Sequence, residues 1–491
     1  MSRKMETAQS DALKSEAILF GLISEFRGTV PIEDATEIIM SSAYLFWQDP
    51  DQAIEALESG EKRLQHYLFE ACQALCEARQ LPLKSEYYRQ ISCSGLIESY
   101  RQIYQQCDAN RLNFAHFVAE GIYTGVTIEN RRHSGDLDSS SIPYLMRNIA
   151  RLYPYQKVYD GACGFGRLLY LLNPPTFIAR DIVPINVALT QLLFEMLTRK
   201  GCFLVGDTLM GADSANQAID QSIEKASQQE VEQEAEQEVP EESAPESIQT
   251  SAPAREAITE PLGVDMVISQ PPLGIQIDSK LLTTLAKSPY LLMDDPISSR
   301  ASDSLWIQEA LYQTHARGRV ILHIAPGWSY RAGYDLALRK ELLERNWVEA
   351  LIYLPGSMMS YTGIESNILI LNRAKKVNTI RLIDGRSLGF ISSKKRYRIF
   401  SEADIKQITT RLQASDLSEV QASDTNSDFA LDIPLSEIRK KNYDLSATLY
   451  FSKIERLELT SIAEEQRKLL QLSEQCQKLQ AEFQALVEEI G

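Results

Sequence analysis

The spacing of hydrophobic and polar positions changes once along the chain, near residue 150. Between residues 10 and about 110 apolar positions recur at helical spacing, for example at Leu64, Leu68 and Leu75, with glycine and proline in the breaks. From about residue 150 short apolar runs alternate with amphipathic stretches. The runs are VYD (158–160), FIARD (177–181), CFLVGD (202–207), VDMVIS (264–269), RVILHIAP (319–326), VEALIYLP (348–355) and NILILN (367–372).

These runs predict strands in a mostly parallel sheet. Strands that are apolar on both sides and separated by helical stretches need helices on both faces of the sheet. The predicted fold class is therefore α/β, doubly wound, preceded by a helical N-terminal domain.

Charge is spread unevenly along the 491 residues. The 50 Lys and Arg residues against 67 Asp and Glu give a net charge of −17, which by itself argues against an acidic partner such as DNA. Residues 212–262 hold 13 acidic and 2 basic side chains, or −11 of that total, and contain no aromatic residue. We expect a disordered acidic insertion there. The remaining −6 neither supports nor forbids DNA binding.

Cysteine and histidine usage predicts neither disulfides nor a metal site. The seven cysteines are irregularly placed, and Cys72 and Cys76 have the i,i+4 spacing of one helix face. The five histidines are scattered. The chain shows neither a signal peptide nor a long apolar span, so we expect a cytoplasmic protein with reduced thiols.

Candidate chemistry begins where the first predicted strand ends. Asp160 leads into a glycine turn, GACGFG (161–166), where the backbone can approach a ligand and the amides at the helix start can face it. Asp181 ends the next strand, where a carboxylate can accept both ribose hydroxyls of a nucleoside cofactor, and Asp207 follows the third. A chance set of acidic residues at strand ends is the alternative. The predicted cofactor-binding residues are Asp160, Gly161, Ala162, Cys163, Gly164, Gly166, Asp181 and Asp207.

The cofactor that suits this spacing is S-adenosylmethionine. The turn lacks the G-x-G-x-x-G order that seats a dinucleotide pyrophosphate. A further signal, SQPPL (269–273), stands at another strand end. Its two prolines fix the turn and leave backbone carbonyls free, because proline has no N–H to compete for them.

With these motifs in order, the chain resembles the modification subunits of type I restriction-modification systems, which are adenine-specific N-6 DNA methyltransferases. DGACGFG stands where that family has D-P-A-C-G-S-G, ARDIVP where it has an acidic residue before Asn-Pro, and QPPL where it has N-P-P-F. GDTL matches a third signature, and residues 318–373 and 435–450 match longer family stretches. The resemblance, which runs from about Asn113 to Tyr450, implies a Rossmann-like S-adenosylmethionine-dependent methyltransferase sheet.

The resemblance also implies a mechanism and catalytic residues. The target adenine is flipped into the pocket, its amine is held by an amide carbonyl and a proline carbonyl, and an aromatic ring stacks on the base. The corresponding positions are Gln270, Pro271, Pro272 and Leu273.

Two of these positions depart from the family pattern. Gln270 adds a methylene to the amide, and Leu273 has no π-face. The G-x-F-x-T-P signature, which touches the methionine end of the cofactor, aligns with GDLDSS (135–140) and has lost its aromatic residue and proline. Two hypotheses therefore stay open. In the first, the chain is an active methyltransferase with a repacked pocket. In the second, it is a catalytically impaired scaffold that binds cofactor, DNA or a specificity subunit. A third, methylation of RNA or protein, is disfavoured by the match at 318–373.

The predicted domains are 1–110 (helical), 111–400 (methyltransferase), 401–448 (C-terminal subdomain) and 449–491 (long helix). The last carries an alternating seam, Leu472, Cys476, Leu479, Phe483, Leu486 and Ile490. It suits either packing on its own domain or a coiled coil. Basic runs at 394–398 and 439–441 are compatible with phosphate contact or with a solvated face. The family's partners are DNA, a specificity subunit and a restriction subunit, so we expect a hetero-oligomer.

Overall fold

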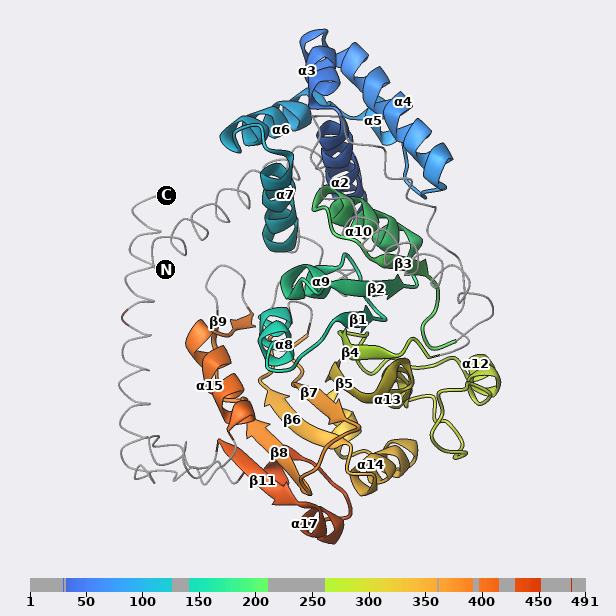
Figure 1. The fold of residues 1–491 in the computed structure, drawn as a ribbon, viewed down its shortest axis with the longest axis vertical. Helices are drawn as coiled ribbons and strands as arrows, with labels where there is room; N and C mark the ends of the chain where they lie inside the picture. The colour runs from blue at the N-terminus through green and yellow to red at the C-terminus, as the bar shows by residue number, and fades with distance from the viewer. Residues whose placement is uncertain are drawn as a thin grey trace, which may run out of the picture. The chain divides into compact units, whose positions relative to one another are not determined.

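The computed structural model describes residues 30, 32–125, 141–210, 261–359, 362–391, 397–414, 429–451 and 478 (Figure 1). It divides into two units, Met1–Ala447 and Thr448–Gly491, and only residues 448–451 and 478 of the second are described. Four predictions fall wholly or largely outside the described residues. They concern the acidic insertion at 212–262, GDLDSS at 135–140, the basic residues 394–396 and the C-terminal helix at 449–491.

The N-terminal part is helical, as predicted. Leu64 and Leu68 on its longest helix are fully buried, which is what the helical spacing of apolar residues requires. Proline at the first helical position and an Asp49 side chain that accepts from the Gln52 amide fix the start of the second helix. The helices are α2 (Ile32–Gln48), α3 (Pro50–Glu58), α4 (Glu61–Arg79), α5 (Tyr87–Gln90), α6 (Ser94–Gln106) and α7 (Arg111–Gly125).

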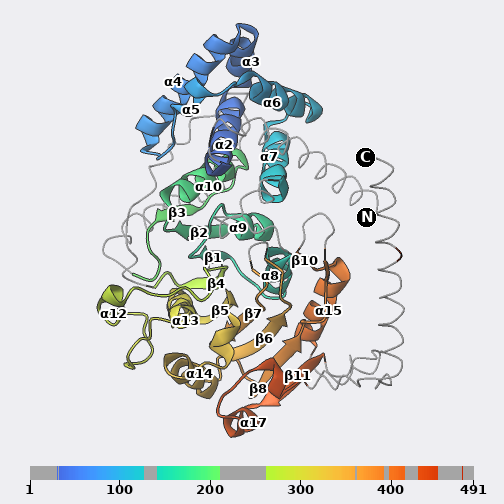
Figure 2. The ribbon, with the colours of Figure 1, turned by 180° about the vertical axis from the view of Figure 1, so that it is seen from behind.

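This helical part is attached to the sheet domain through α10 (Pro184–Met196). The Tyr44 hydroxyl donates to Glu195 at 2.8 Å, and the Arg79 guanidinium pairs with the same carboxylate at 2.5 Å. Figures 1 and 2 show α2 and α7 beside α10, beyond the end of the sheet formed by β3. The N-terminal helices thus pack at one edge of the sheet.

All seven predicted strands are present in one nine-stranded sheet, of order β11-β8-β6-β7-β5-β4-β1-β2-β3. Two further strands of that sheet, β8 and β11, and a separate two-stranded ribbon were not predicted. The strands are β1 (Lys157–Asp160), β2 (Thr176–Asp181), β3 (Cys202–Val205), β4 (Val264–Ser269), β5 (Thr314–Ile324), β6 (Val348–Leu354), β7 (Ser366–Asn372), β8 (Thr379–Asp384) and β11 (Ala430–Pro434), with β9 (Phe390–Ile391) and β10 (Arg398–Ile399) in the ribbon.

The half of the sheet from β3 to β5 is entirely parallel. The other half is mixed, because β7 runs antiparallel to both β5 and β6, and β11 runs antiparallel to β8. In a parallel half sheet all strands end at one edge. Asp160 lies opposite Ala179 and Asp181 lies opposite Val205, so both carboxyl groups belong to that edge.

Helices cover both faces, as a doubly wound sheet requires. Val158 of β1 belongs to the main apolar cluster, which also contains residues of α8, α9 and α10. The next residue, Tyr159, points to the opposite face, where its hydroxyl reaches Glu309 of α13. The remaining helices are α8 (Ile142–Ala150), α9 (Arg167–Leu172), α12 (Ser279–Leu285), α13 (Ser302–Gln313), η2 (Pro326–Ser329), α14 (Tyr334–Glu344), α15 (Glu402–Gln413), α17 (Leu435–Lys440) and η3 (Ala447–Leu449).

Within the described part of the chain, no helix has both the length and the apolar character needed to cross a membrane.

Candidate functional site

The glycine turn joins β1 to α9 and depends on glycine at its last position. Gly166 has φ +75°, and a Cβ there would lie 2.6 Å from Thr190 Cγ2. Gly161 is also close-packed, because its Cβ would lie 2.9 Å from Tyr159 Oη. Larger side chains at these two positions would therefore displace the turn from the end of β1.

Asp160 is the buried carboxyl group that links this turn to β4. Its side chain is only 1% exposed, and Oδ1 accepts from Ser269 Oγ at 2.6 Å and from the Ala162 amide at 3.2 Å. Burial raises the pKa of Asp160 to about 7, and the nearby Asp181 carboxyl adds to the rise. The hydrogen bond to Ser269 places the start of the QPPL loop beside the glycine turn.

Asp181 fixes the turn from the neighbouring strand. Its Oδ2 accepts from the Gly164 amide at 2.9 Å and its Oδ1 from the Val183 amide at 2.9 Å. Burial raises the pKa of this carboxyl group too. Oδ1 also accepts from Asn186 Nδ2 at 3.5 Å, whereas Oδ2 keeps a second lone pair that can accept a hydroxyl hydrogen.

The turn uses most of its own amides. Besides Ala162 and Gly164, the Cys163 amide donates to Arg180 O at 2.9 Å, and the Gly166 amide donates to Cys163 O at 2.7 Å. The expectation that the amides face a ligand is therefore not met at these four positions. At these positions the glycine backbone allows a ligand to approach closely, but it does not provide free amide donors.

Asp207 lies just beyond β3 and is half-buried. Its Oδ1 accepts from the Leu209 amide at 2.9 Å, and Thr208 Oγ1 donates to Gly161 O at 2.6 Å. The end of β3 is thereby held against the glycine turn. All the predicted cofactor-binding residues thus lie along one edge of the sheet.

The QPPL loop follows Ser269 at the same edge. Gln270 is half-buried, Pro271 is buried and Pro272 is exposed. Leu273 is half-buried and packs against the main apolar cluster. Gly274 lies close to the end of β5, since its Cβ would be 3.5 Å from that of Ala325.

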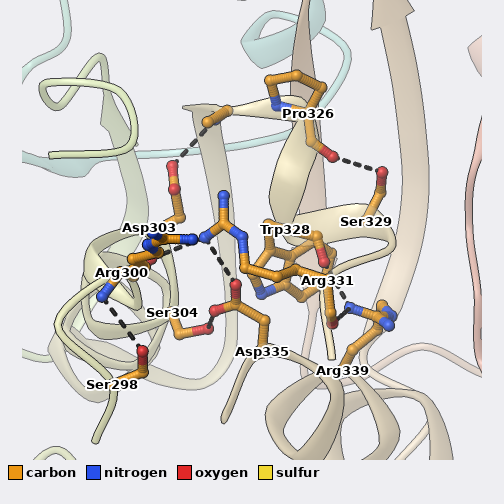
Figure 3. Close-up of polar contacts among 11 residues, drawn as sticks. Ser298, Arg300, Asp303, Ser304, Pro326, Trp328, Ser329, Arg331, Asp335 and Arg339 are labelled. Carbon is orange, nitrogen blue, oxygen red and sulfur yellow. Dashed lines mark hydrogen bonds and ion pairs between the residues drawn. The ribbon is translucent and has the colours of Figure 1, made fainter. Parts of the chain in front are cut away.

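A polar cluster that no sequence pattern predicted lies beyond β5 (Figure 3). Asp303 Oδ1 accepts from the Ala325 amide at 2.9 Å, while its Oδ2 is buried without a partner. Burial raises the pKa of Asp303 to about 6. Asp335 accepts from Ser304 Oγ at 2.6 Å and from Arg331 at 3.0 Å. This cluster anchors the chain that leaves β5 beside the QPPL loop.

Arg339 completes the cluster from α14 and is 1% exposed. Its Nη1 donates to Trp328 O at 2.5 Å (Figure 3). Its Nε donates to Tyr443 O at 2.6 Å. It therefore ties the segment after α17 to η2. Nothing in the sequence distinguishes this arginine from others on amphipathic helices, because its partners are backbone carbonyls far away in the chain.

Comparison with known proteins finds a family that is similar to part of the chain. Residues 245–458 match the model of the N-6 DNA methylase family. This part of the chain is therefore similar to N-6 DNA methylases. The matched region includes β4 and the QPPL loop, and it starts after the glycine turn.

Several methylase subunits are similar to this chain over part of their length. The chain is 31% identical over 201 residues to the type I restriction enzyme MpnII methylase subunit of Mycoplasma pneumoniae, covering 40% of this chain and 35% of that protein. It is 29% identical over 178 residues to the HindI methylase subunit of Haemophilus influenzae, covering 35% of this chain and 39% of that protein. The similarity to modification subunits is as the sequence predicted, and it spans just over a third of each relative.

The fold is shared more widely than the sequence. The crystal structure of the type I restriction-modification methyltransferase subunit from Streptococcus thermophilus has a TM-score of 0.53 at 14% identity, with 90% of this chain and 100% of that chain covered. The Rossmann-like methyltransferase sheet and the helical N-terminal region are therefore confirmed.

Proposed function

We propose that this chain is the modification subunit of a type I restriction-modification or related defence complex. It transfers a methyl group from S-adenosylmethionine to the exocyclic amine of adenine in DNA. The observation that carries the proposal is the Asp160–Ser269 hydrogen bond of 2.6 Å. It joins a glycine turn suited to a nucleoside cofactor to the proline loop of an N-6 DNA methylase region.

The residues at the sheet edge fit the cofactor. Close packing around Gly161 and Gly166 keeps side chains out of the turn. Asp181 can accept a ribose hydroxyl through the remaining lone pair of Oδ2, and Asp207 borders the same edge from β3. When bound, S-adenosylmethionine supplies an electrophilic methyl group on a sulfonium. Asp160, Gly161, Ala162, Cys163, Gly164 and Gly166 hold and shape the turn that receives it.

The QPPL loop supplies the groups for the base. The side-chain carbonyl of Gln270 and the backbone carbonyl of Pro271 accept the two amine hydrogens, which orients the nitrogen lone pair toward the methyl donor. Pro272 fixes the turn, and Leu273 gives an apolar surface to the base. Catalysis of this kind depends on positioning and electrostatics.

A second candidate function is a scaffold with impaired transfer. The observation that favours it is the position of Leu273, whose side chain packs on the main apolar cluster where the family has an aromatic ring. Such a chain would still bind the cofactor, DNA or a specificity subunit.

The proposed partners follow from the relatives. Those similar to this chain are named methylase subunits of type I restriction enzymes, so DNA, a specificity subunit and a restriction subunit are the partners we infer. The chain would then act as part of a hetero-oligomer. Outside residues 212–262 the chain has a net charge of only −6. This small charge is compatible with a subunit that binds DNA together with a partner subunit.

Binding of S-adenosylmethionine tests the cofactor half of the proposal. Asp181→Asn should weaken binding at least about tenfold, because hydrogen bonds to a charged group contribute about 1.5–3 kcal/mol each. Isothermal titration of the full chain measures the change. Asp384→Asn is the matched control, since Asp384 ends β8 and pairs with Arg386 at 2.7 Å. Failure of the wild-type chain to bind, or equal losses in both variants, would contradict the proposal.

A further inference from the structure

Arg167 is a buried arginine with two guanidinium nitrogens that have no hydrogen-bond partner. It directly follows the glycine turn and is 6% exposed. Its Nε and Nη1 are shielded from solvent and have no hydrogen-bond partner. The contact recorded for its guanidinium is with the ring of Tyr144, whose centroid lies 5.4 Å from Cζ.

Two other buried arginines, Arg180 and Arg339, show how such groups can be satisfied within the protein. Arg180 donates to the carbonyls of Gly206 and Asp207, and Arg339 donates to Trp328 and Tyr443. A buried charge without such partners destabilises the folded protein, and a nearby aromatic ring offsets only part of that cost. A ligand with an acceptor group would recover the rest.

The surroundings define the chemistry of that ligand. Four amides of the turn already donate within the protein, and the carboxyl groups of Asp160 and Asp181 would repel an anion. A ligand that carries a carboxylate at this edge therefore needs a cation and fresh donors. Arg167 provides both immediately beside the turn, with a fork of nitrogens that matches the two oxygens of a carboxylate.

We propose that Arg167 binds the carboxylate at the amino-acid end of the cofactor. This inference rests on the proposed function, because it assumes that S-adenosylmethionine occupies the edge. Four amides of the glycine turn donate within the protein and are not available to the carboxylate. In this proposal the Arg167 side chain recognises the carboxylate instead.

A thermodynamic cycle that removes each partner separately tests the assignment. The ligands are S-adenosylmethionine and decarboxylated S-adenosylmethionine, which differ only in the carboxylate. The proteins are the full wild-type chain and Arg167→Met, with affinities from isothermal titration. The wild type should prefer the carboxylated ligand at least about tenfold, and Arg167→Met should lose that preference while binding the decarboxylated ligand as the wild type does.

Two further variants separate binding from structure. Arg167→Lys should keep part of the preference, because it retains the charge but not the fork. Arg199→Met removes another arginine stacked on a tyrosine, 4.9 Å from the Tyr170 centroid, and should leave the preference unchanged.

The possible outcomes show whether the assignment of Arg167 or the proposed function itself is wrong. If the wild type binds both ligands equally, or Arg167→Met weakens both by the same factor, the assignment of Arg167 is wrong and the proposed cofactor stands. If the wild type binds neither ligand, the proposed function itself fails. If Arg167→Met does not fold, the wild-type ratio and the Arg167→Lys ratio still decide the matter.

Discussion

Asp160→Asn should make the protein more stable at pH 8 than the wild type, although it alters the centre of the candidate site. Burial raises the pKa of Asp160 to about 7 from its usual 3.8. The folded state therefore holds this proton more tightly than the unfolded state. Stability from this group is complete below about pH 4 and is lost as the pH rises through 7.

The size of the effect follows from the shift in pKa. Each pKa unit corresponds to about 1.4 kcal/mol, so the ionised carboxyl lowers the free energy of unfolding by at most about 4 kcal/mol above pH 7. Asparagine keeps an oxygen that can accept from Ser269 and Ala162 but carries no charge. We expect a gain of roughly 1–3 kcal/mol at pH 8 and little gain at pH 4.

Denaturant unfolding across this pH range measures the change. Glu309→Gln is the matched control, because burial also raises the pKa of Glu309 to about 7, on the other face of the sheet beneath Tyr159. Glu309→Gln should reduce the pH dependence of the free energy of unfolding as Asp160→Asn does, and it should leave the affinity for the cofactor unchanged. The free energies of unfolding of Asp160→Asn and the wild type should differ more at pH 8 than at pH 4. An equal difference at both pH values would contradict the argument from ionisation of Asp160.

The double variant Gln270→Asn, Leu273→Phe should transfer methyl groups faster than the wild type. A displacement of about 1 Å in a near-attack geometry costs on the order of a hundredfold, and stacking of a base on an aromatic ring contributes about 1–3 kcal/mol. Restoring both groups should raise the rate about tenfold to hundredfold. The rate is measured with labelled cofactor and duplex DNA, in the complex with the specificity subunit.

Ile275→Phe controls for the addition of an aromatic ring near the loop, since Ile275 is 42% exposed. Leu273→Phe also enlarges a side chain that packs on the main cluster, so a loss of about 1–3 kcal/mol in stability should accompany the gain in rate. A wild type that is already fast, and that the double variant slows or leaves unchanged, would exclude the scaffold alternative. It would show that the pocket is adapted to glutamine and leucine.

Apolar runs made seven strands predictable. The direction of those strands in the sheet, and the presence of β8 and β11, were not predictable. The centre of β7, residues 368–371, is an uninterrupted apolar run, and such a run does not indicate whether the strand is parallel or antiparallel to β5 and β6. β8 is too mixed in burial to form such a run, and β11 contains an aspartate and ends in proline. Both owe their place in the sheet to each other and to β6 rather than to their own pattern.

The candidate site was predictable where a topological rule applies. Asp160, Asp181 and Asp207 lie at one edge because parallel strands end together. Contacts between distant segments were not predictable. The hydrogen bond from Ser269 to Asp160 spans 109 residues, and the pairing of the turn's amides depends on Arg180 and Asp181. The unpaired nitrogens of Arg167 beside this turn were not predictable either.

Transfer of labelled methyl groups from S-adenosylmethionine, by this chain in complex with its specificity subunit, is the measurement that decides the central claim. Duplex DNA, RNA and protein would be offered together, and the labelled product identified after digestion. We predict label in N6-methyladenine of DNA and its loss in Asp160→Ala. Label in RNA or protein instead, or no transfer above the Asp160→Ala level, would contradict the proposed adenine methyltransferase.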